Sequence, residues 1–238
     1  LTSLVLDCAV WGVGDPATLT WLDPPPPSAL AAARDELRDL GAIDADGRIT
    51  RRGNHLRDLP LPPRLAGMVV EAAIRGDGDA AARIAAVLVE RGLGGMDTDL
   101  DQRLTQFNRD RGERAQQMRR LAQGWAQRAA VSARMVPTHG EPPRAAALLA
   151  LAYPDRIAKA RGTAGQFVLA NGRGAMLDAT DPLARAHFLV GGEWQGSAAE
   201  IWILRVIKMV DRRIGSLRGC WHSLPDLRRG AGTRYTMA

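Results

Sequence analysis

The sequence has little cysteine, little lysine and few aromatic residues, and it has no long apolar run. Its two cysteines, Cys8 and Cys220, lie far apart, and neither belongs to the paired Cys/His spacing that a zinc site needs. No stretch reaches the roughly 18 apolar residues that span a bilayer, and no charged N-terminus precedes an apolar signal core. These absences predict a reducing compartment, a cytoplasmic location and no membrane contact.

Sequence signatures of self-contained catalysis are also missing. No G-x-x-x-x-G-K-[ST] loop is present to cradle the phosphates of a nucleotide. The four histidines are scattered, so none has the paired spacing of a zinc protease, and no G-x-S-x-G elbow exposes a nucleophilic serine. We therefore expect no catalytic residue, no metal and no bound cofactor in this chain, and no ATP hydrolysis by the chain alone.

The charge that is present is mostly positive, and nearly all of the positive charge is arginine. The formal net charge is +6, and Lys159 and Lys208 are the only lysines. Such an excess predicts a polyanionic partner such as nucleic acid. A bias in genomic base composition, which the abundant alanine also suggests, explains the arginine equally well. Charge alone leaves both interpretations open.

The first sixty residues have the pattern of a winged helix. Residues 28–40 combine an N-capping serine, Ser28, with apolar residues at helical spacing, and Gly41 supplies the C-terminal turn. Asp46 and Gly47 predict a tight hairpin turn with positive φ at both central residues. Helices followed by a small β-hairpin are typical of a winged helix.

Helices dominate the next segment. The residues from Arg64 and from Asp79 predict a helical hairpin, and apolar periodicity predicts a longer helix over 99–128 that Gly112 weakens. We expect Arg64 to form an ion pair that fixes the junction with the first domain. The exposed side of the long helix is either a solvated face or a phosphate-facing stripe. The arginines of this stripe are Arg109, Arg111, Arg114, Arg119, Arg120 and Arg128.

After a proline-rich loop and a short alanine-leucine helix, the sequence changes to the chemistry of strands and turns. Short apolar runs at 166–170, 174–177 and 187–190 are separated by the turn signals Asn171-Gly172 and Asp181-Pro182. These runs predict a small β-barrel or sheet after the helices. The expected fold class is therefore α+β, rich in helix.

The order of several segments resembles a known family. The segments are W-L-D-P-P-P-P at 21–27, L-P-L-P-P-R-L-A at 59–66, V-L-V-E-R-G at 87–92, L-A-L-A-Y-P-D-R-I-A at 149–158 and L-A-N-G-R-G-A at 169–175. The first two resemble the winged helix and the following junction of DEAH/RHA-type ATP-dependent helicases. The later ones resemble the HrpB subgroup of that family.

This resemblance implies three domains: a winged helix over 1–60, a helical ratchet bundle over 61–136 and an OB-like β-domain over 144–196. Residues 197–238 depart from the family pattern and stay an unassigned tail. The resemblance also implies RecA-like motor domains elsewhere in the full-length protein, which would bind ATP and magnesium. The implied ligand is single-stranded RNA or DNA, held while the motor domains pull it.

Four cations are the candidates for phosphate contact. Arg156, Lys159 and Arg161 cluster at the entry to the β-domain, and Arg173 projects from a glycine-flanked turn. The structural alternative is a Y-P-D turn with ordinary surface cations. The functional alternative is a non-enzymatic winged-helix DNA-binding regulator, which needs no motor domain.

Overall fold

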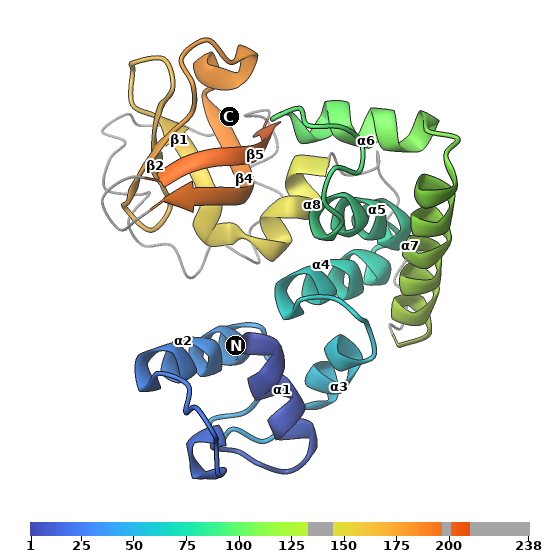
Figure 1. The fold of residues 1–238 in the computed structure, drawn as a ribbon, viewed down its shortest axis with the longest axis vertical. Coiled ribbons are helices and arrows are strands. Elements are labelled where there is room, and N and C mark those ends of the chain that lie inside the picture. Colours follow the sequence, from blue (N-terminus) through green and yellow to red (C-terminus); the bar gives the residue numbers. More distant parts are fainter. Residues whose placement is uncertain (133–144, 197–200, 210–238) are drawn as a thin grey trace, which may run out of the picture. The chain divides into compact units, whose positions relative to one another are not determined.

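The computed structural model describes residues 1–132, 145–196 and 201–209, and these residues form two compact units (Figure 1). We call them the helical unit, residues 1–89 and 116–132, and the barrel unit, residues 90–115, 145–196 and 201–209. Helices followed by a closed barrel confirm the α+β class, rich in helix. The three-domain division into 1–60, 61–136 and 144–196 stays a prediction.

The helical unit begins with two packed helices and a short helical turn. These are α1 (Thr2–Val10), η1 (Pro16–Thr18) and α2 (Pro27–Asp39). Of the four residues predicted to form the buried stripe of α2, Leu30, Ala33 and Leu37 are buried, whereas Leu40 is the C-cap and only partly buried. The N-cap of α2 is Pro26 without a side-chain hydrogen bond, so the prediction that Ser28 caps this helix is wrong. Proline fixes φ near its helical value and lacks an N–H that would need a cap, so the N-cap lies two residues earlier than predicted.

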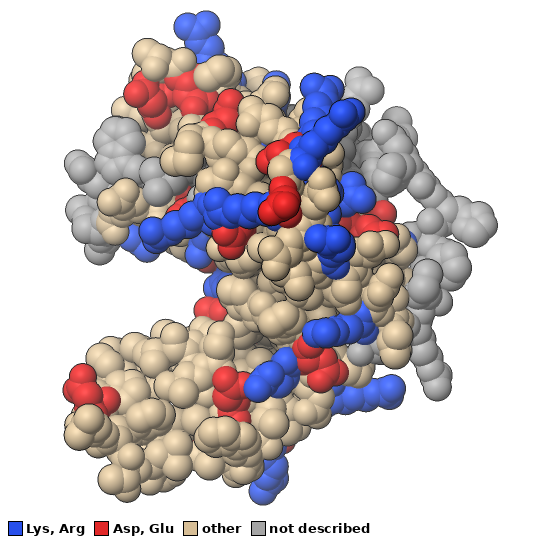
Figure 2. Space-filling view, turned by 45° about the vertical axis from the view of Figure 1, so that its right-hand side comes forward, with Lys and Arg blue, Asp and Glu red and all other residues tan. Residues whose placement is uncertain are grey.

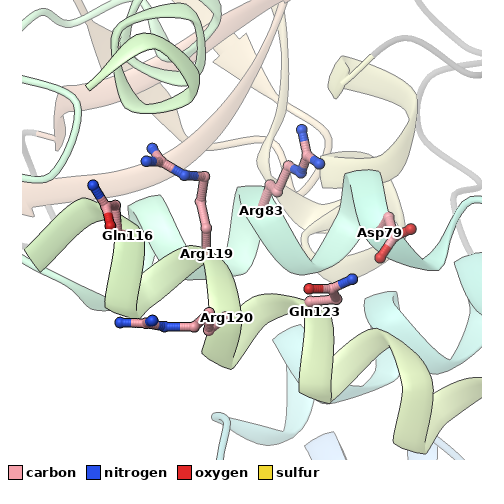
Figure 3. A pocket seen from close by; sticks show the side chains of 6 residues that line it. All are labelled: Asp79, Arg83, Gln116, Arg119, Arg120 and Gln123. Carbon is pink, nitrogen blue, oxygen red and sulfur yellow. The ribbon is translucent and has the colours of Figure 1, made fainter. Parts of the chain in front are cut away.

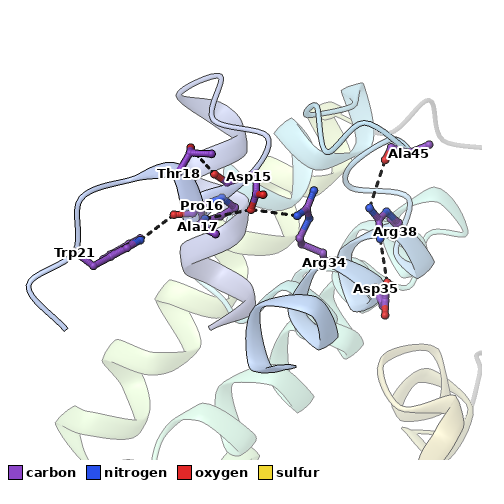
Figure 4. A network of polar contacts seen from close by, with 9 residues as sticks. All are labelled: Asp15, Pro16, Ala17, Thr18, Trp21, Arg34, Asp35, Arg38 and Ala45. Atoms are coloured by element: carbon purple, nitrogen blue, oxygen red, sulfur yellow. Dashed lines mark hydrogen bonds and ion pairs between the residues drawn. The ribbon is translucent and has the colours of Figure 1, made fainter. Parts of the chain in front are cut away.

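A polar network ties the η1 turn to α2 (Figure 4). Asp15 accepts a hydrogen bond from the backbone N–H of Ala17 at 3.1 Å and forms an ion pair with Arg34 of α2 at 3.2 Å. The indole N–H of Trp21 donates to the carbonyl of Pro16 at 2.8 Å. The N-capping role expected from an aspartate before a proline is therefore present, and the same carboxylate also anchors the neighbouring helix.

The predicted wing is a single bridge between Ile43 and Ile49 rather than a hairpin of two strands. Gly47 has φ +82°, but no residue other than glycine has a positive φ in the described part of the chain, so Asp46 does not share this conformation. The prediction of two left-handed turn residues was wrong. The Asp44 side chain explains the difference, because it accepts from the N–H of Arg48 at 2.8 Å and closes the turn itself.

Replacing Gly47 by valine is expected to destabilise the helical unit by more than about 1 kcal/mol, because a β-branched residue resists positive φ. A steric clash adds to the loss of stability, since a Cβ at this position would lie 2.5 Å from the Gly14 carbonyl oxygen. Thermal unfolding compares the variant with Gly12→Ala, which also has positive φ but has no heavy atom within 4 Å of its Cβ position. Equal losses in the two variants would show that the Gly14 approach has no effect.

Three further helices follow in the helical unit, which also contains most of the later helix α7. They are α3 (Arg51–Arg57), α4 (Pro63–Ile74) and α5 (Gly78–Val89). Thr50 caps α3 by accepting from the N–H of Gly53 at 3.0 Å. The expected ion pair at the junction is confirmed, because Arg64 of α4 lies 3.4 Å from the Glu36 carboxylate of α2.

The long helix expected over 99–128 is two helices. They are α6 (Leu100–Arg109) and α7 (Glu113–Ser132), separated at Asp110–Gly112. Asp110 has extended backbone angles, and its carboxylate accepts from the N–H of Gly112 at 2.8 Å. An aspartate that accepts a hydrogen bond from the backbone two residues ahead competes with the helical hydrogen bonds. The first helix, α6, therefore ends at Arg109, and α7 begins at Glu113. Gly112 therefore marks a break and not only a weak point.

The barrel unit contains α8 (Ala145–Ala152), the turns η2 (Pro154–Arg156) and η3 (Pro182–Arg185), and five strands. The strands are β1 (Ile157–Ala160), β2 (Gln166–Leu169), β3 (Gly174–Met176), β4 (Phe188–Gly196) and β5 (Ile201–Met209). They close into a barrel in the order β1-β2-β3-β5-β4, where only the β3 and β5 pair is parallel. A closed five-stranded barrel agrees with the expected OB-like domain.

The segment after residue 196, left unassigned from sequence, supplies the closing strand. Ile201–Met209 is β5, which pairs along its whole length with β4. Its inward residues Ile201, Ile203 and Val206 join the barrel core with Phe167 and Leu189. The sequence of β5 does not alternate between apolar and polar residues, because apolar residues occupy both of its faces. The remaining tail from residue 210 lies outside the described residues.

Candidate nucleic-acid interface

Lys159 lies on the outer wall of the barrel. It is exposed on β1, where it pairs with Val168 of β2 and Phe188 of β4. Its neighbours Ala158 and Ala160 face the core on the other side of the strand. Successive side chains of a strand point to opposite faces, so the ammonium group is directed to solvent. The sequence prediction of an accessible cation here agrees with this position.

Arg161 follows β1 directly and is also exposed. Its N–H donates to the carbonyl of Gln166 at 3.0 Å, which continues the pairing with β2 by one step. Positions two apart in an extended strand share a face and are separated by roughly 7 Å. The phosphate contacts expected of Lys159 and Arg161 stay a prediction.

Arg173 occupies the turn between β2 and β3. Gly172 has φ +83°, and the N–H of Arg173 donates to the Asn171 side-chain oxygen at 3.1 Å. The carbonyl of Arg173 accepts from the N–H of Leu169 at 2.8 Å, which closes the turn. The expected glycine-flanked turn is therefore present, and its last residue, Arg173, is exposed.

Arg156 differs from the other three because its guanidinium is built into the barrel wall. Its Cζ lies 4.0 Å from the ring centroid of Tyr153 and 4.6 Å from that of Trp194. Its Nη1 donates to the carbonyl of Gly192 at 2.9 Å. A cation between two aromatic rings is stabilised by both, so Arg156 joins η2 to β4. Its predicted phosphate contact stays a prediction, and the structure adds a structural role that the sequence did not indicate.

The four predicted residues divide between the two ends of β1. The turn carrying Arg173 follows β2 at the end where Ala170 bonds the carbonyl of Ile157, which is the end at which Arg156 enters. Arg161 leaves β1 at the opposite end, and Lys159 lies near it. The candidate residues are therefore spread along the paired strands β1 and β2 and do not form one compact cluster.

Acidic groups interrupt the positive charge of the chain. Asp178 follows β3 at the end where Arg161 leaves β1, and hydrogen bonds from the hydroxyl and the N–H of Thr180 lower the pKa of its carboxyl. The carboxylate is therefore charged beside one end of the candidate surface. Basic and acidic side chains also lie among each other on the face drawn in Figure 2. The local arrangement of basic and acidic side chains, and not the net charge alone, has to account for any binding of nucleic acid.

The arginine stripe expected on one long helix is dispersed by the break between α6 and α7. Arg109 ends α6 and Arg111 lies within the break. Arg114 is paired with the carboxylate of Glu90 and donates to the carbonyl of Arg91. Arg119 and Arg120 line a cavity together with Arg83 of α5. Arg83 was not among the residues predicted from the sequence. It lies on α5, which is separated from α7 by more than twenty residues of the chain.

Other chemistry is sparse among the described residues. Residues 1–132, 145–196 and 201–209 contain no group of three or more histidine, cysteine or acidic side chains that could hold a metal ion. Burial raises the pKa of the Cys8 thiol and that of the Asp99 carboxyl, which caps α6. His139 and His222 lie outside the described residues. No helix in the described ranges is both long and apolar enough to cross a membrane.

Comparison with known proteins identifies relatives of the whole arrangement. Residues 33–61 match the family model of the helicase associated domain (HA2), winged-helix. The ATP-dependent RNA helicase HrpB of Escherichia coli is 37% identical over 203 residues, which are 84% of this chain and 23% of that protein. The probable ATP-dependent RNA helicase DHR2 of Saccharomyces cerevisiae is 38% identical over 73 residues, 31% of this chain and 10% of that protein.

Solved structures agree with these relatives. The crystal structure of the E. coli DExH-box NTPase HrpB superposes with a TM-score of 0.73 at 35% identity, covering 95% of this chain and 26% of that one. A second crystal structure, of the Escherichia coli DEAH/RHA helicase HrpB, gives a TM-score of 0.72 at 36% identity over 90% of this chain. The chain spans about a quarter of the length of these proteins. It therefore corresponds to the C-terminal accessory portion of an HrpB-like DEAH/RHA helicase.

Proposed function

We propose that this region binds single-stranded RNA or DNA as the accessory part of an ATP-dependent helicase. RecA-like motor domains of the full-length protein would hydrolyse ATP and pull the strand past it. The observation that carries this proposal is the match to HrpB over 84% of the chain, which includes both the winged-helix segment and the barrel. The alternative, a winged-helix DNA-binding regulator, is supported only by the winged-helix match over 33–61.

We assign the binding of the nucleic-acid strand to the barrel. Lys159, Arg161 and Arg173 are exposed along the paired strands β1 and β2, and Arg156 joins η2 to β4 by its aromatic contacts. Barrels of this kind bind single strands through cations that track the backbone and aromatic side chains that stack on bases. Phosphate contacts position a strand without reading its sequence, so the binding should be tolerant of sequence.

Replacing Lys159, Arg161 and Arg173 together by alanine is expected to weaken single-strand binding about ten-fold or more at moderate salt. The salt slope should also fall by about 2, because each phosphate contact to a single strand contributes about 0.7. Fluorescence anisotropy of a labelled single-stranded oligonucleotide at several salt concentrations measures both quantities. Arg156 is left unchanged, since its loss would disturb Tyr153 and Trp194 as well as charge.

The matched control replaces Arg38, Arg48 and Arg57 by alanine. All three are exposed, and each is paired with a nearby carboxylate of the helical unit, so the control removes the same charge elsewhere. We expect it to keep nearly the full affinity. If this control loses as much affinity as the barrel variant, net charge explains the binding. A larger loss in this control, together with a preference for duplex DNA, would favour the regulator.

A further inference from the structure

A polar cavity of about 360 Å³ opens on the surface of the helical unit, between α5 and α7 (Figure 3). It is lined by Asp79, Arg83, Gln116, Arg119, Arg120 and Gln123. Both contributing segments belong to one compact unit, and that unit does not include the barrel. The cavity is therefore separate from the surface discussed above.

Helical spacing explains why these side chains meet. Gln116, Arg119, Arg120 and Gln123 lie three, four and seven residues apart on α7, so they share one face. Asp79 and Arg83 are four residues apart and share one face of α5. In Figure 3 the side chains of Arg83 and Arg119 extend to the same side of the two helices. One arginine from each helix thus lines the cavity.

The lining decides which ligand fits. Cavities that take apolar molecules are lined mainly by apolar and aromatic side chains, and this one has none among its lining residues. The lining residues include three arginines and one acidic residue, Asp79. Arginine presents its N–H donors in a planar fork that matches phosphate oxygens, and the two glutamine amides add further donors. The composition selects for an oxyanion with several oxygen atoms.

We propose that the α5–α7 cavity is a phosphoryl-binding site. Arg83 and Arg119 bind the phosphoryl oxygens, Arg120 adds positive charge at the rim, and Gln116 and Gln123 donate to the remaining oxygens. Asp79, one turn before Arg83 on α5, weakens anion binding and limits the site to ligands that carry more than one negative charge or that bind both arginines. The phosphoryl group belongs either to a small free phosphate compound or to the backbone of a nucleic-acid strand, which use the same contacts.

The test measures two ligands with the complete chain, inorganic pyrophosphate by calorimetry and a labelled single-stranded oligonucleotide by anisotropy. The double variant Arg83→Gln/Arg119→Gln keeps the length and polarity of both side chains but removes their charge. It should weaken pyrophosphate binding at least about ten-fold, because charge-assisted hydrogen bonds to phosphate are the strong ones. The control Arg38→Gln/Arg128→Gln removes two exposed arginines outside the cavity and should leave this binding nearly unchanged.

A third variant guards against loss by misfolding. Asp79→Asn removes the carboxylate from the cavity and should tighten pyrophosphate binding several-fold, a gain that an unfolded protein cannot produce. If the double variant weakens pyrophosphate alone, the natural ligand is a small phosphate compound. If it weakens the oligonucleotide, with or without pyrophosphate, the ligand is the strand backbone.

Three results would overturn the site: no difference between the double variant and wild type for either ligand, an equal loss in the control, or no gain from Asp79→Asn. These outcomes are independent of the barrel proposal. Replacing Lys159, Arg161 and Arg173 should leave pyrophosphate binding unchanged, so the failure of one site is distinguishable from the failure of the other.

Discussion

Replacing Gly53 by alanine is expected to lower the free energy of unfolding of the helical unit by about 3 kcal/mol or more. Gly53 is buried in α3, and a Cβ there would overlap the carbonyl oxygen of Ala42 and would lie 2.5 Å from the Ile49 side chain. The oxygen belongs to the backbone, which cannot rotate away as a side chain can. The first turn of α3 would have to move, and with it the hydrogen bond from Gly53 to Thr50.

Gly124→Ala is the matched control for this prediction. Gly124 lies inside α7, and its Cβ would meet no heavy atom within 4 Å. Alanine costs less backbone entropy than glycine in a helix, so this variant should gain about 0.5–1 kcal/mol. Denaturant unfolding monitored by circular dichroism measures both variants. A Gly53→Ala protein as stable as wild type would mean that α3 does not approach Ala42 as closely as described.

Replacing Phe167 by alanine is expected to destabilise the barrel by about 3–5 kcal/mol. Phe167 is 1% exposed on β2 and packs in the core with Leu169, Leu189 and Val206. Removing its ring leaves a cavity that the paired strands on either side cannot close. The barrel is a small unit, so a loss of this size is a large part of its stability.

Gln166→Ala provides the comparison on the same strand. Gln166 is exposed, and its hydrogen bonds with Arg161 and Thr163 are made by its backbone atoms. Its replacement should change the free energy of unfolding by no more than about 0.5 kcal/mol. Proteolysis of the barrel during unfolding can follow this unit by itself. Similar losses from the two variants would contradict the alternation that places Phe167 inside and Gln166 outside.

Local sequence signals predicted the elements whose geometry is decided locally. The aspartate before Pro16, the apolar stripe of α2 and the glycine turn before Arg173 are examples. In each, one capping group, one helical period or one positive φ determines the structure. That helices come first and a small barrel or sheet follows also came from such signals.

Features that depend on distant segments were missed or wrong. The strand β5 is apolar on both faces because it closes the barrel, so its sequence has no period that marks a strand. The prediction of positive φ at both Asp46 and Gly47 was wrong because the Asp44 side chain closes that turn instead. The phosphoryl-binding cavity needs Arg83 and Arg119 on different helices, and no spacing within one helix reveals it.

The central claim is that this accessory region binds a single strand through charges on its barrel. The most direct measurement is the affinity of the unmodified chain for a labelled single-stranded oligonucleotide between about 50 and 200 mM salt, with a duplex of the same sequence beside it. We expect the single strand to bind more tightly than the duplex, with a plot of log affinity against log salt that falls by about 2 or more. Equal or tighter duplex binding, or an affinity that does not change with salt, would contradict the account.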